Sequence, residues 1–407
     1  MNRSILHCDM NNFYASVETL YTPELAGKAV AVCGEEALRH GIVLAKSEAA
    51  KKMGVKTGDP IWKARLCCPD LVVIPPHFDR YAKYSRLARE IYCEYTDLVE
   101  PFGMDECWLD VTSSRMAFGT GEVIGGEIRR RIRKELGLTI SVGISFNKVF
   151  AKLGSDLKKP DATTLIPPDG FQSIVWPLPV EDLLWVGPKS ASLLHRFGID
   201  TIGQLAHANS DLMRMKFGKK GMQMKEAAAG MDASPVLPCD AEPPMKSIGH
   251  GVTLPRDLTE PEEVRLLIFA LCQRIGEQLR FHEKLACGIA LDCKDCSFFV
   301  KSLQKKLTLP SDCTATLAEE AFRLFRERYA FRTPLRSLSV RAIDLKKRSE
   351  GTQLSLFDTP RDRRSELLDR VGDRLREKYG KNALVSASLL HYSLPDDNVE
   401  CTPFSAP

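Results

Sequence analysis

The clearest pattern of apolar and polar positions lies between residues 246 and 345. Apolar and polar residues alternate over 285–293 and again over 335–345, as expected for strands with one buried face. Apolar residues recur at helical spacing over 261–281 and 315–329. With strands expected at 246–254 and 298–309, the order is β-α-β-β-α-β. This order predicts a ferredoxin-like domain of about a hundred residues.

The N-terminal part shows a less regular pattern. A short strand over 5–8 ends at Asp9, and a helix begins near Asn12. Farther along, the pattern predicts helices at 81–97 and 121–136 and strands at 107–111 and 138–144. Strands and helices interleave here without a regular parallel period, which predicts an α+β domain with an insertion.

Proline-rich stretches divide the remaining chain. They lie at 166–180 and 234–245, and the sequence between them predicts only short helices. A polar link follows residue 346, and the charged stretch 361–379 has helical spacing. A chain of 407 residues is expected to form two to four domains. We therefore expect an α+β multidomain protein.

Composition narrows the class of protein. With 44% hydrophobic and 27% charged residues, a globular chain is expected. The longest apolar run, Leu266 to Cys272, is too short to cross a bilayer, and no signal core follows the first residues. Thirteen scattered cysteines favour reduced thiols and a cytoplasmic location without membrane contact. The net charge of +4 permits a nucleic-acid partner without requiring one.

Several enzyme classes are excluded by their missing motifs. The sequence has no phosphate-binding P-loop, no H-E-x-x-H and no G-x-S-x-G. A single C-x-x-C at Cys293 and Cys296 leaves a zinc site open, with Cys287 or His282 as further ligands. Without a second pair, two cysteines near a strand end are the simpler interpretation.

Acidic residues form the first candidate site. Asp9 ends a strand, and Asp105 and Glu106 follow a Phe-Gly turn. Carboxylates at adjacent strand ends can share Mg²⁺, whose coordination substrate phosphates complete. In a regular strand Asp105 and Glu106 would face opposite ways. A joint role therefore requires that they lie in the turn, where Gly103 relaxes the backbone. A solvated surface pair is the alternative.

Aromatic and basic residues add two further candidates. A ring from Phe13 or Tyr14 beneath a bound sugar would clash with a 2′-hydroxyl, although Phe13 fits a core position better and Tyr14 fits either role. Lysines between Lys148 and Lys159 suit a triphosphate or a solvated helix end. The turn at Gly187, followed by Lys189, is typical of a hairpin that holds a DNA phosphate.

Several of these segments together resemble Y-family DNA polymerases, most closely the bacterial polymerase IV group. The matching segments are 8–18, 104–106, 142–148 and Lys159-Pro160, and the resemblance runs from residue 1 to about 345. It implies the architecture of a right-hand polymerase. The expected parts are a palm (1–10 and 77–166), fingers (11–76), a small helical thumb with a helix-hairpin-helix (167–235), a little finger (245–345) and a tail (346–407).

The resemblance also implies roles for individual residues. Two Mg²⁺ ions would be held by Asp9, Asp105, Glu106 and the backbone carbonyl of Met10, with Glu106 as the catalytic residue. Tyr14 would be the steric gate against ribonucleotides. The other implied contacts are Phe13, Lys51 and Lys159 to the nucleotide, and Gly187 and Lys189 to DNA.

The fingers depart from the family pattern. Where the family presents Thr, Tyr and Arg to the incoming phosphates, this chain has Ala45, Glu48 and Lys51, and Lys46 is a further candidate. Lysine keeps the charge of arginine but loses its bidentate fork. These fingers and the Asn11-Asn12 pair also resemble the catalytic subunit of the mutagenic polymerase V. The triphosphate contacts in the fingers therefore stay open.

The segment Gln353-Leu354-Ser355-Leu356-Phe357 resembles the peptide by which bacterial polymerases bind the sliding clamp. Gln353 would make hydrogen bonds, Leu356 and Phe357 would fill an apolar pocket, and Leu354 is the fourth residue assigned to the clamp contact. Packing on the chain's own domain is the alternative. We therefore expect a monomeric, error-prone translesion polymerase that uses primer-template DNA, dNTPs and a clamp.

Three other functions stay open at this point. They are a polymerase V-like catalytic subunit, a nucleotidyl cyclase on the same palm, and a non-catalytic protein that binds DNA and the clamp. The sequence does not predict which lesions the enzyme copies, how faithful it is, or whether it needs accessory subunits.

Overall fold

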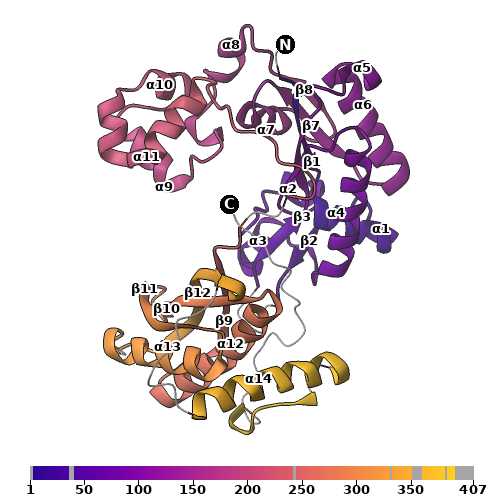
Figure 1. Ribbon diagram of the computed structural model, residues 1–407. Coiled ribbons are helices and arrows are strands. Elements are labelled where there is room, and N and C mark those ends of the chain that lie inside the picture. The colour runs from indigo at the N-terminus through magenta and orange to yellow at the C-terminus, as the bar shows by residue number, and fades with distance from the viewer. Residues whose placement is uncertain are drawn as a thin grey trace. The chain divides into compact units, whose positions relative to one another are not determined.

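The computed structural model describes residues 3–35, 41–241, 244–330, 332–350, 360–380 and 383–389 (Figure 1). The chain forms two compact units, one from residues 1–34 and 42–242 and one from residue 243 onward. Each unit has its own sheet and core. None of the helices in these ranges is long and apolar enough to cross a membrane.

The larger sheet of the first unit has five strands. Its order is β5-β6-β1-β7-β8, with β7 and β8 parallel and the other pairs antiparallel. The strands are β1 (Ile5–Met10), β5 (Val99–Phe102), β6 (Glu106–Asp110), β7 (Ile140–Ser145) and β8 (Thr163–Leu165). Every residue of β1 and β7 is buried, so helices must cover this sheet on both faces.

The two faces of β1 have different neighbours. On one face, Leu6 and Cys8 belong to a core that includes α4 (Phe78–Cys93) and α6 (Gly121–Arg131). On the other face lies α7 (Lys148–Leu157), and Figure 1 shows these helices on opposite sides of the strands. Gly143 permits this approach, since a Cβ there would lie 1.9 Å from the carbonyl oxygen of Ala151. The α7 helix therefore lies directly on the odd-numbered face of β1.

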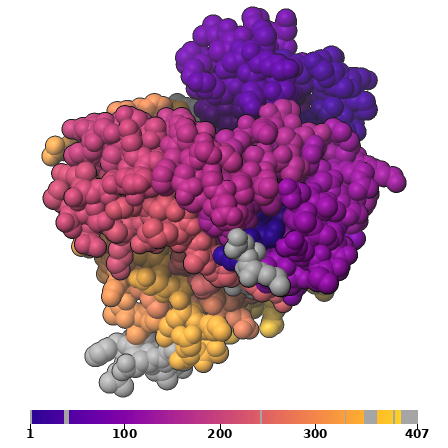
Figure 2. All heavy atoms as spheres, turned by 90° about the horizontal axis from the view of Figure 1, so that it is seen from above, coloured from indigo at the N-terminus to yellow at the C-terminus, as the bar shows by residue number. Residues whose placement is uncertain are grey.

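A smaller sheet and two groups of helices complete the first unit. The small sheet has the order β3-β2-β4. Helix α11 is longer than the short helices expected in this region, but Gly218 interrupts it with φ 60° and ψ −142°. Residues of α7 and of α8 to α11 share one hydrophobic core, and the magenta and pink surfaces of these parts of the chain adjoin in Figure 2. The elements are α1 (Phe13–Tyr21), β2 (Val30–Cys33), β3 (Val43–Lys46), α2 (Glu48–Lys52), α3 (Ile61–Cys67), β4 (Val72–Ile74), α5 (Arg115–Phe118), α8 (Phe171–Val175), α9 (Pro188–His195), α10 (Ile202–His207) and α11 (Ser210–Ala228).

The second unit confirms the predicted β-α-β-β-α-β order. Its elements are β9 (Ser247–Leu258), α12 (Pro261–Phe281), β10 (Lys284–Asp295), β11 (Val300–Ser311), α13 (Thr314–Arg328) and β12 (Leu335–Lys347). The antiparallel sheet has the order β11-β10-β12-β9. Apolar residues on one face of this sheet form a core with α12 and α13. The other face carries glycine, serine and charged residues.

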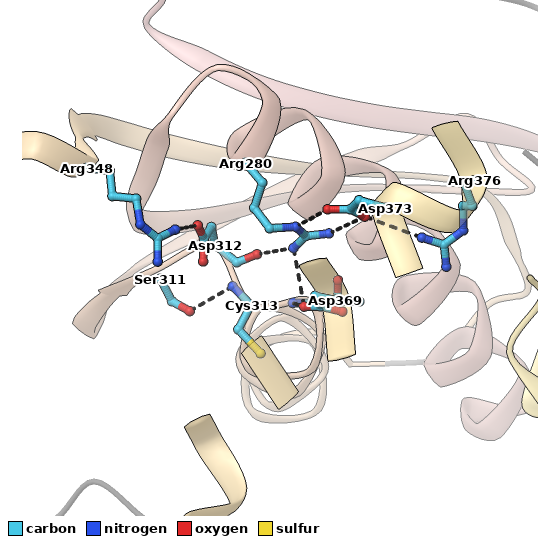
Figure 3. A network of polar contacts seen from close by, with 9 residues as sticks. Arg280, Ser311, Asp312, Cys313, Arg348, Asp369, Asp373 and Arg376 are labelled. Atoms are coloured by element: carbon cyan, nitrogen blue, oxygen red, sulfur yellow. Dashed lines mark hydrogen bonds and ion pairs between the residues drawn. The ribbon is translucent and has the colours of Figure 1, made fainter. Parts of the chain in front are cut away.

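The predicted helix after residue 360 is present as α14 (Pro360–Tyr379). It is held on α12 and α13 by polar contacts rather than by an apolar stripe (Figure 3). The guanidinium of Arg280 contacts Asp373 at 2.5 Å and Asp369 at 3.3 Å, and the backbone N–H of Thr314 donates to Asp369 at 2.7 Å. Leu367 and Leu368 of α14 are exposed. The contact side of this helix is therefore its acidic side.

Candidate active site

The strand register brings two of the predicted carboxylates together. Asp9 of β1 lies directly opposite Glu106 of β6, and His7 lies opposite Trp108. Directly opposed residues of an antiparallel pair project from the same face of the sheet. Alternation along β1 places His7 on that face as well. The three side chains therefore share the face on which α7 lies.

Asp105 lies in a turn, as its proposed role requires. Gly103 has φ +82°, a conformation that favours glycine, and β6 begins only at Glu106. The backbone N–H of Met10 donates to the carbonyl oxygen of Asp105 at 3.0 Å. This hydrogen bond fixes the turn to the end of β1. Asp105 and Glu106 are consequently not constrained to face opposite ways.

Helix α7 supplies a cation to Glu106. The Lys152 ammonium lies 2.5 Å from Glu106 Oε2, and His7 Nε2 lies 3.2 Å from the same oxygen. His7 Nδ1 is 2.9 Å from Ser155 Oγ, and that hydroxyl donates to the carbonyl oxygen of Lys152. Since the Ser155 proton is used in this way, Ser155 accepts from His7 Nδ1–H. The α7 helix thus holds both neighbours of Glu106.

The segment after α7 supplies a second cation. The Lys159 ammonium lies 2.6 Å from Asp9 Oδ2 and 2.7 Å from Asp156 Oδ1. The buried side chain of Asn11 fixes this segment, because its Oδ1 accepts from the backbone N–H of Asp161 at 2.8 Å. Lys159 is therefore held beside the end of β1 from two directions.

The three carboxylates have different proton affinities. Burial raises the pKa of Asp9 to about 7, although Lys159 opposes this shift. Burial, followed by the charge of Glu106, raises the pKa of Asp105 to about 6. Burial also acts on Glu106, but His7 and Lys152 overcome it and lower its pKa to about 2. Like charges in a desolvated cluster cause this spread.

This donor set fits a hard cation. One ligand atom each from His7, Asp9 and Glu106 lies within 4.8 Å of the other two, the one such grouping of three among the described residues. Carboxylate oxygens are the ligands that Mg²⁺ prefers. Two ammonium groups already contact these carboxylates, which shows that the cluster attracts positive charge. Cys293 is buried in β10 and takes part in no such grouping in the described part of the chain.

The two candidate aromatic residues differ in environment. The ring of Phe13 is 3% exposed and belongs to the core, which leaves it little surface for a nucleotide. Tyr14 is half-buried, and its hydroxyl donates to Met104 Sδ at 3.5 Å. Its ring stacks on Tyr81 at 4.2 Å. Of the two, Tyr14 is the one whose side chain keeps exposed surface, and it therefore stays the candidate for the steric gate.

Strand β3 and helix α2, in the predicted fingers, bring Lys46 and Lys51 close to each other. Lys46 donates to Thr57 at 3.0 Å, and burial followed by the charge of Lys51 lowers the pKa of Lys46. Glu48 lies near the same lysine and partly offsets that repulsion. The segment therefore offers two ammonium groups and one carboxylate, which keeps both lysines as candidates for triphosphate contacts.

The remaining candidates lie away from this cluster or outside the described residues. Gly187 precedes α9, and both it and Lys189 are exposed. Gln353, Leu354, Leu356 and Phe357 fall outside the described residues.

Sequence reasoning gave no role to His7 or Asn11, and it offered Lys152 only as a candidate for a triphosphate contact rather than as the partner of Glu106. His7 could have been found from its spacing to Asp9, because residues two apart on a strand share a face. The roles of Lys152 and Asn11 depend on how α7 and the segment after it pack on β1. No local pattern in the sequence carries that information.

Comparisons with known proteins identify the family of this chain. Residues 8–156 match the model of the impB/mucB/samB family, and residues 245–356 match the model of that family's C-terminal domain. A DNA polymerase IV from Acetivibrio thermocellus is 48% identical, over 93% of this chain and 96% of that protein. DNA polymerase IV 1 of Bacillus subtilis is 36% identical, over 96% of this chain and 94% of that protein.

A solved structure shows the same fold. A Y-family DNA polymerase chimera, Dbh-Dpo4(243-245)-Dbh, has a TM-score of 0.75 and 23% sequence identity. The match covers 84% of this chain and 99% of the chimera. It confirms the expected α+β fold of a right-hand polymerase with a little finger. Together, the family models and the relatives confirm the resemblance found in the sequence, and the chain belongs to the impB/mucB/samB family in its DNA polymerase IV group.

Proposed function

We propose that this protein is a template-directed, error-prone DNA polymerase that copies past lesions, and that Asp9, Asp105 and Glu106 form its catalytic centre. The single observation that carries the site assignment is the packing of Glu106 beside Lys152 and of Asp9 beside Lys159, with Asp105 in the turn fixed to the end of β1. The relatives, all named DNA polymerase IV, support the reaction class.

Different residues of this chain would have separate roles in nucleotidyl transfer. Asp9, Asp105, Glu106 and the carbonyl of Met10 would hold two Mg²⁺ ions. Bound Mg²⁺ would supply Lewis-acid stabilisation of the charge that develops on the phosphates. Lys159 would exchange its contact with Asp9 for the triphosphate of the incoming dNTP. Lys152 would stay on Glu106 and keep that carboxylate ionised.

Three other parts would bind the substrates and partners. Lys51, with Lys46, would contact the triphosphate from the fingers. Gly187 and Lys189, together with the polar face of the second unit, would hold the DNA backbone without reading its sequence. Residues Gln353, Leu354, Leu356 and Phe357 would bind a sliding clamp. We expect the enzyme to act as a monomer.

Primer extension with one dNTP at a time tests the proposal. The wild-type protein should add the complementary dNTP opposite each template base and require a divalent cation. A cyclase would convert a nucleotide without a template, and a non-catalytic DNA-binding protein would extend nothing. A polymerase V-like subunit would extend only with added accessory proteins. Extension by the isolated chain therefore excludes all three.

The clamp contact needs a separate test. The double change Leu356→Ala and Phe357→Ala should leave synthesis by the isolated enzyme and its melting temperature unchanged while removing stimulation by the host clamp. Flexible attachment to a ring on the DNA can raise apparent affinity roughly 10²–10⁴-fold. Retained stimulation would contradict the clamp assignment. A lower melting temperature with weaker unassisted synthesis would instead show that these residues pack on their own domain.

A further inference from the structure

A buried carboxylate lies one helical turn beyond Tyr14. Glu18 of α1 is 2% exposed, and within the described part of the chain its side chain is hydrogen-bonded by residues of α4 and by His77, the N-cap residue of that helix. The Glu18 carboxylate accepts three hydrogen bonds. The donors are the Tyr81 hydroxyl at 2.6 Å, an Arg80 guanidinium N–H at 2.8 Å and His77 Nδ1 at 2.9 Å. A buried carboxylate is tolerated only when such donors replace water. The cluster therefore ties α1 to α4 at one defined point.

The Tyr81 hydroxyl is held from two sides. It donates to Glu18, and it accepts from the backbone N–H of His77 at 3.1 Å. Its ring is fully buried, and burial together with Glu18 raises its pKa, which keeps the donating proton in place. Tyr81 thus has one allowed ring position, set by its own helix and by a carboxylate of α1.

This fixed ring is the platform on which Tyr14 lies. The two rings stack at a centroid distance of 4.2 Å with an interplanar angle of 10°. Phe78 meets Tyr14 edge-on at 6.1 Å, and the Tyr14 hydroxyl has only the weak acceptor Met104 Sδ at 3.5 Å. Among the described residues, the Tyr81 ring is therefore the aromatic ring closest to Tyr14 and the one stacked on it.

We propose that Tyr81 and Glu18 are positioning residues that set sugar selectivity by fixing the ring of Tyr14. This inference rests on the proposed role of Tyr14 as steric gate. A dNTP and an rNTP differ only in the 2′-hydroxyl group. The position of the gate ring must therefore be fixed to within a fraction of an ångström if it is to exclude one and accept the other. A displacement of about 1 Å in a reaction site can change rates roughly 10²-fold. A gate ring without its platform would move away from the 2′-hydroxyl.

The competing interpretation is that the cluster only holds α1 on α4. Loss of such a role would lower the melting temperature and slow insertion of both sugars alike. Loss of a positioning role would change the ratio of the two rates. The discriminating quantity is therefore the ratio of kcat/KM for a dNTP to that for the matching rNTP, measured in single-nucleotide insertion.

The experiment compares four single variants of the full chain. Tyr81→Leu removes the stacked ring, Tyr81→Phe removes only its hydroxyl, and Glu18→Gln removes the charge that fixes that hydroxyl. Tyr92→Phe is the matched control: Tyr92 is also a buried tyrosine of α4, but its hydroxyl has no hydrogen-bond partner among the described residues. We expect the ratio to fall roughly 10-fold for Tyr81→Leu, severalfold for Tyr81→Phe and Glu18→Gln, and not at all for Tyr92→Phe.

Tyr14→Ala and the double variant Tyr14→Ala/Tyr81→Leu complete the cycle. If Tyr81 acts through Tyr14, the double variant should have the same ratio as Tyr14→Ala alone. Two outcomes would overturn the positioning role alone. In the first, the changes in the ratio caused by Tyr14→Ala and by Tyr81→Leu multiply in the double variant. In the second, Tyr14→Ala changes the ratio but Tyr81→Phe and Glu18→Gln leave it unchanged. An unchanged ratio in Tyr14→Ala would overturn the gate and this inference together. Neither result affects the assignment as a polymerase, which wild-type dNTP insertion tests. Because Tyr81→Phe and Glu18→Gln preserve side-chain shape, the test does not depend on Tyr81→Leu folding.

Discussion

The two large sheets of this protein differ in how far helices cover them. The sheet around β1 and β7 has helices on both faces, and all residues of these two strands are buried. In the described part of the chain, the sheet of β9 to β12 packs α12 and α13 on one face, and over 300–307 of β11 exposed positions alternate with buried or half-buried ones. Carboxylates that must interact strongly with cations lie where water is excluded. Residues suited to a long polyanion lie where water remains.

Burial explains this division. A charge interacts far more strongly in a low-dielectric interior than at a hydrated surface, where salt also screens it. The first sheet can therefore place a few charges that decide the rate of a chemical step. The second can supply only many weak, additive contacts to a backbone. Substitutions in the two sheets should accordingly differ in kind as well as in size.

The largest expected effect comes from the covered sheet. Asp105→Asn or Glu106→Gln should reduce dNTP insertion by roughly 10⁴-fold, because the protein would lose a ligand for the ions that stabilise the transition state. Affinity for primer-template DNA should persist in a filter or anisotropy assay. Asp110→Asn, at the far end of the same strand, is the control and should stay within a few-fold of wild type. Near-normal extension by either site variant would refute the assignment.

Lys159 should show a smaller effect, confined to the nucleotide. Lys159→Met should raise KM for the dNTP by about 10–100-fold, since a point charge for the triphosphate is lost. The neighbouring Lys158 is exposed and has no contact with Asp9, so Lys158→Met should change KM little. Steady-state kinetics on both variants decides the matter. Equal KM values for Lys159→Met and Lys158→Met would mean that Lys159 only neutralises the charge of Asp9 and does not contact the triphosphate.

The covered sheet should also make stability depend on pH. Asp9 and Asp105 have folded pKa values of about 7 and 6, above the unfolded value near 4. Groups whose pKa is raised in the folded state stabilise it below the unfolded pKa and lose this contribution as pH rises through the folded pKa. Without divalent cations, the melting temperature of the first unit should therefore fall between pH 5.5 and pH 8.

The loss should be on the order of a few kcal/mol, and Mg²⁺ should reverse it most at the upper end of this range. Glu106 shifts the other way, so its contribution is lost only below about pH 4.5. Calorimetry with and without Mg²⁺ provides the measurement, and Asp9→Asn should flatten the profile. A melting temperature that rises with pH would contradict the electrostatic account.

Substitutions on the exposed face of the β9 to β12 sheet should have the smallest effect, and only on DNA binding. Lys305 and Lys306 are adjacent in β11 but lie on opposite faces: Lys305 contacts Glu320 of α13 at 2.7 Å, while Lys306 is exposed. Lys306→Ala should weaken DNA binding a few-fold and reduce the slope of log K against log salt by about 0.7–0.9. Lys305→Ala should leave that slope unchanged. Equal slopes for the two variants would mean that the exposed face does not contact DNA.

The same contrast explains how far the sequence could predict the structure. Alternation in 285–293 and 335–345 revealed the second unit because one face of its sheet is exposed. In the covered sheet β1 and β7 are buried throughout, so periodicity showed strands but neither their order nor their register. The pairing of Asp9 with Glu106 is a matter of register, and the contact between Tyr14 and Tyr81 requires two helices to cross. Interactions of this kind depend on the assembled fold.

The polar contacts that hold α14 have a consequence for the proposed clamp-binding segment. Residues 351–359 follow β12 and precede α14, and both neighbours belong to the second unit. The segment is thus joined to one folded body at each end rather than ending freely. Nine residues reach at most about 30 Å when extended, and a return path halves that reach. A clamp bound to this segment would therefore stay within a short distance of the second unit. Because Arg280 holds α14 in place, its contacts with Asp369 and Asp373 would limit that distance.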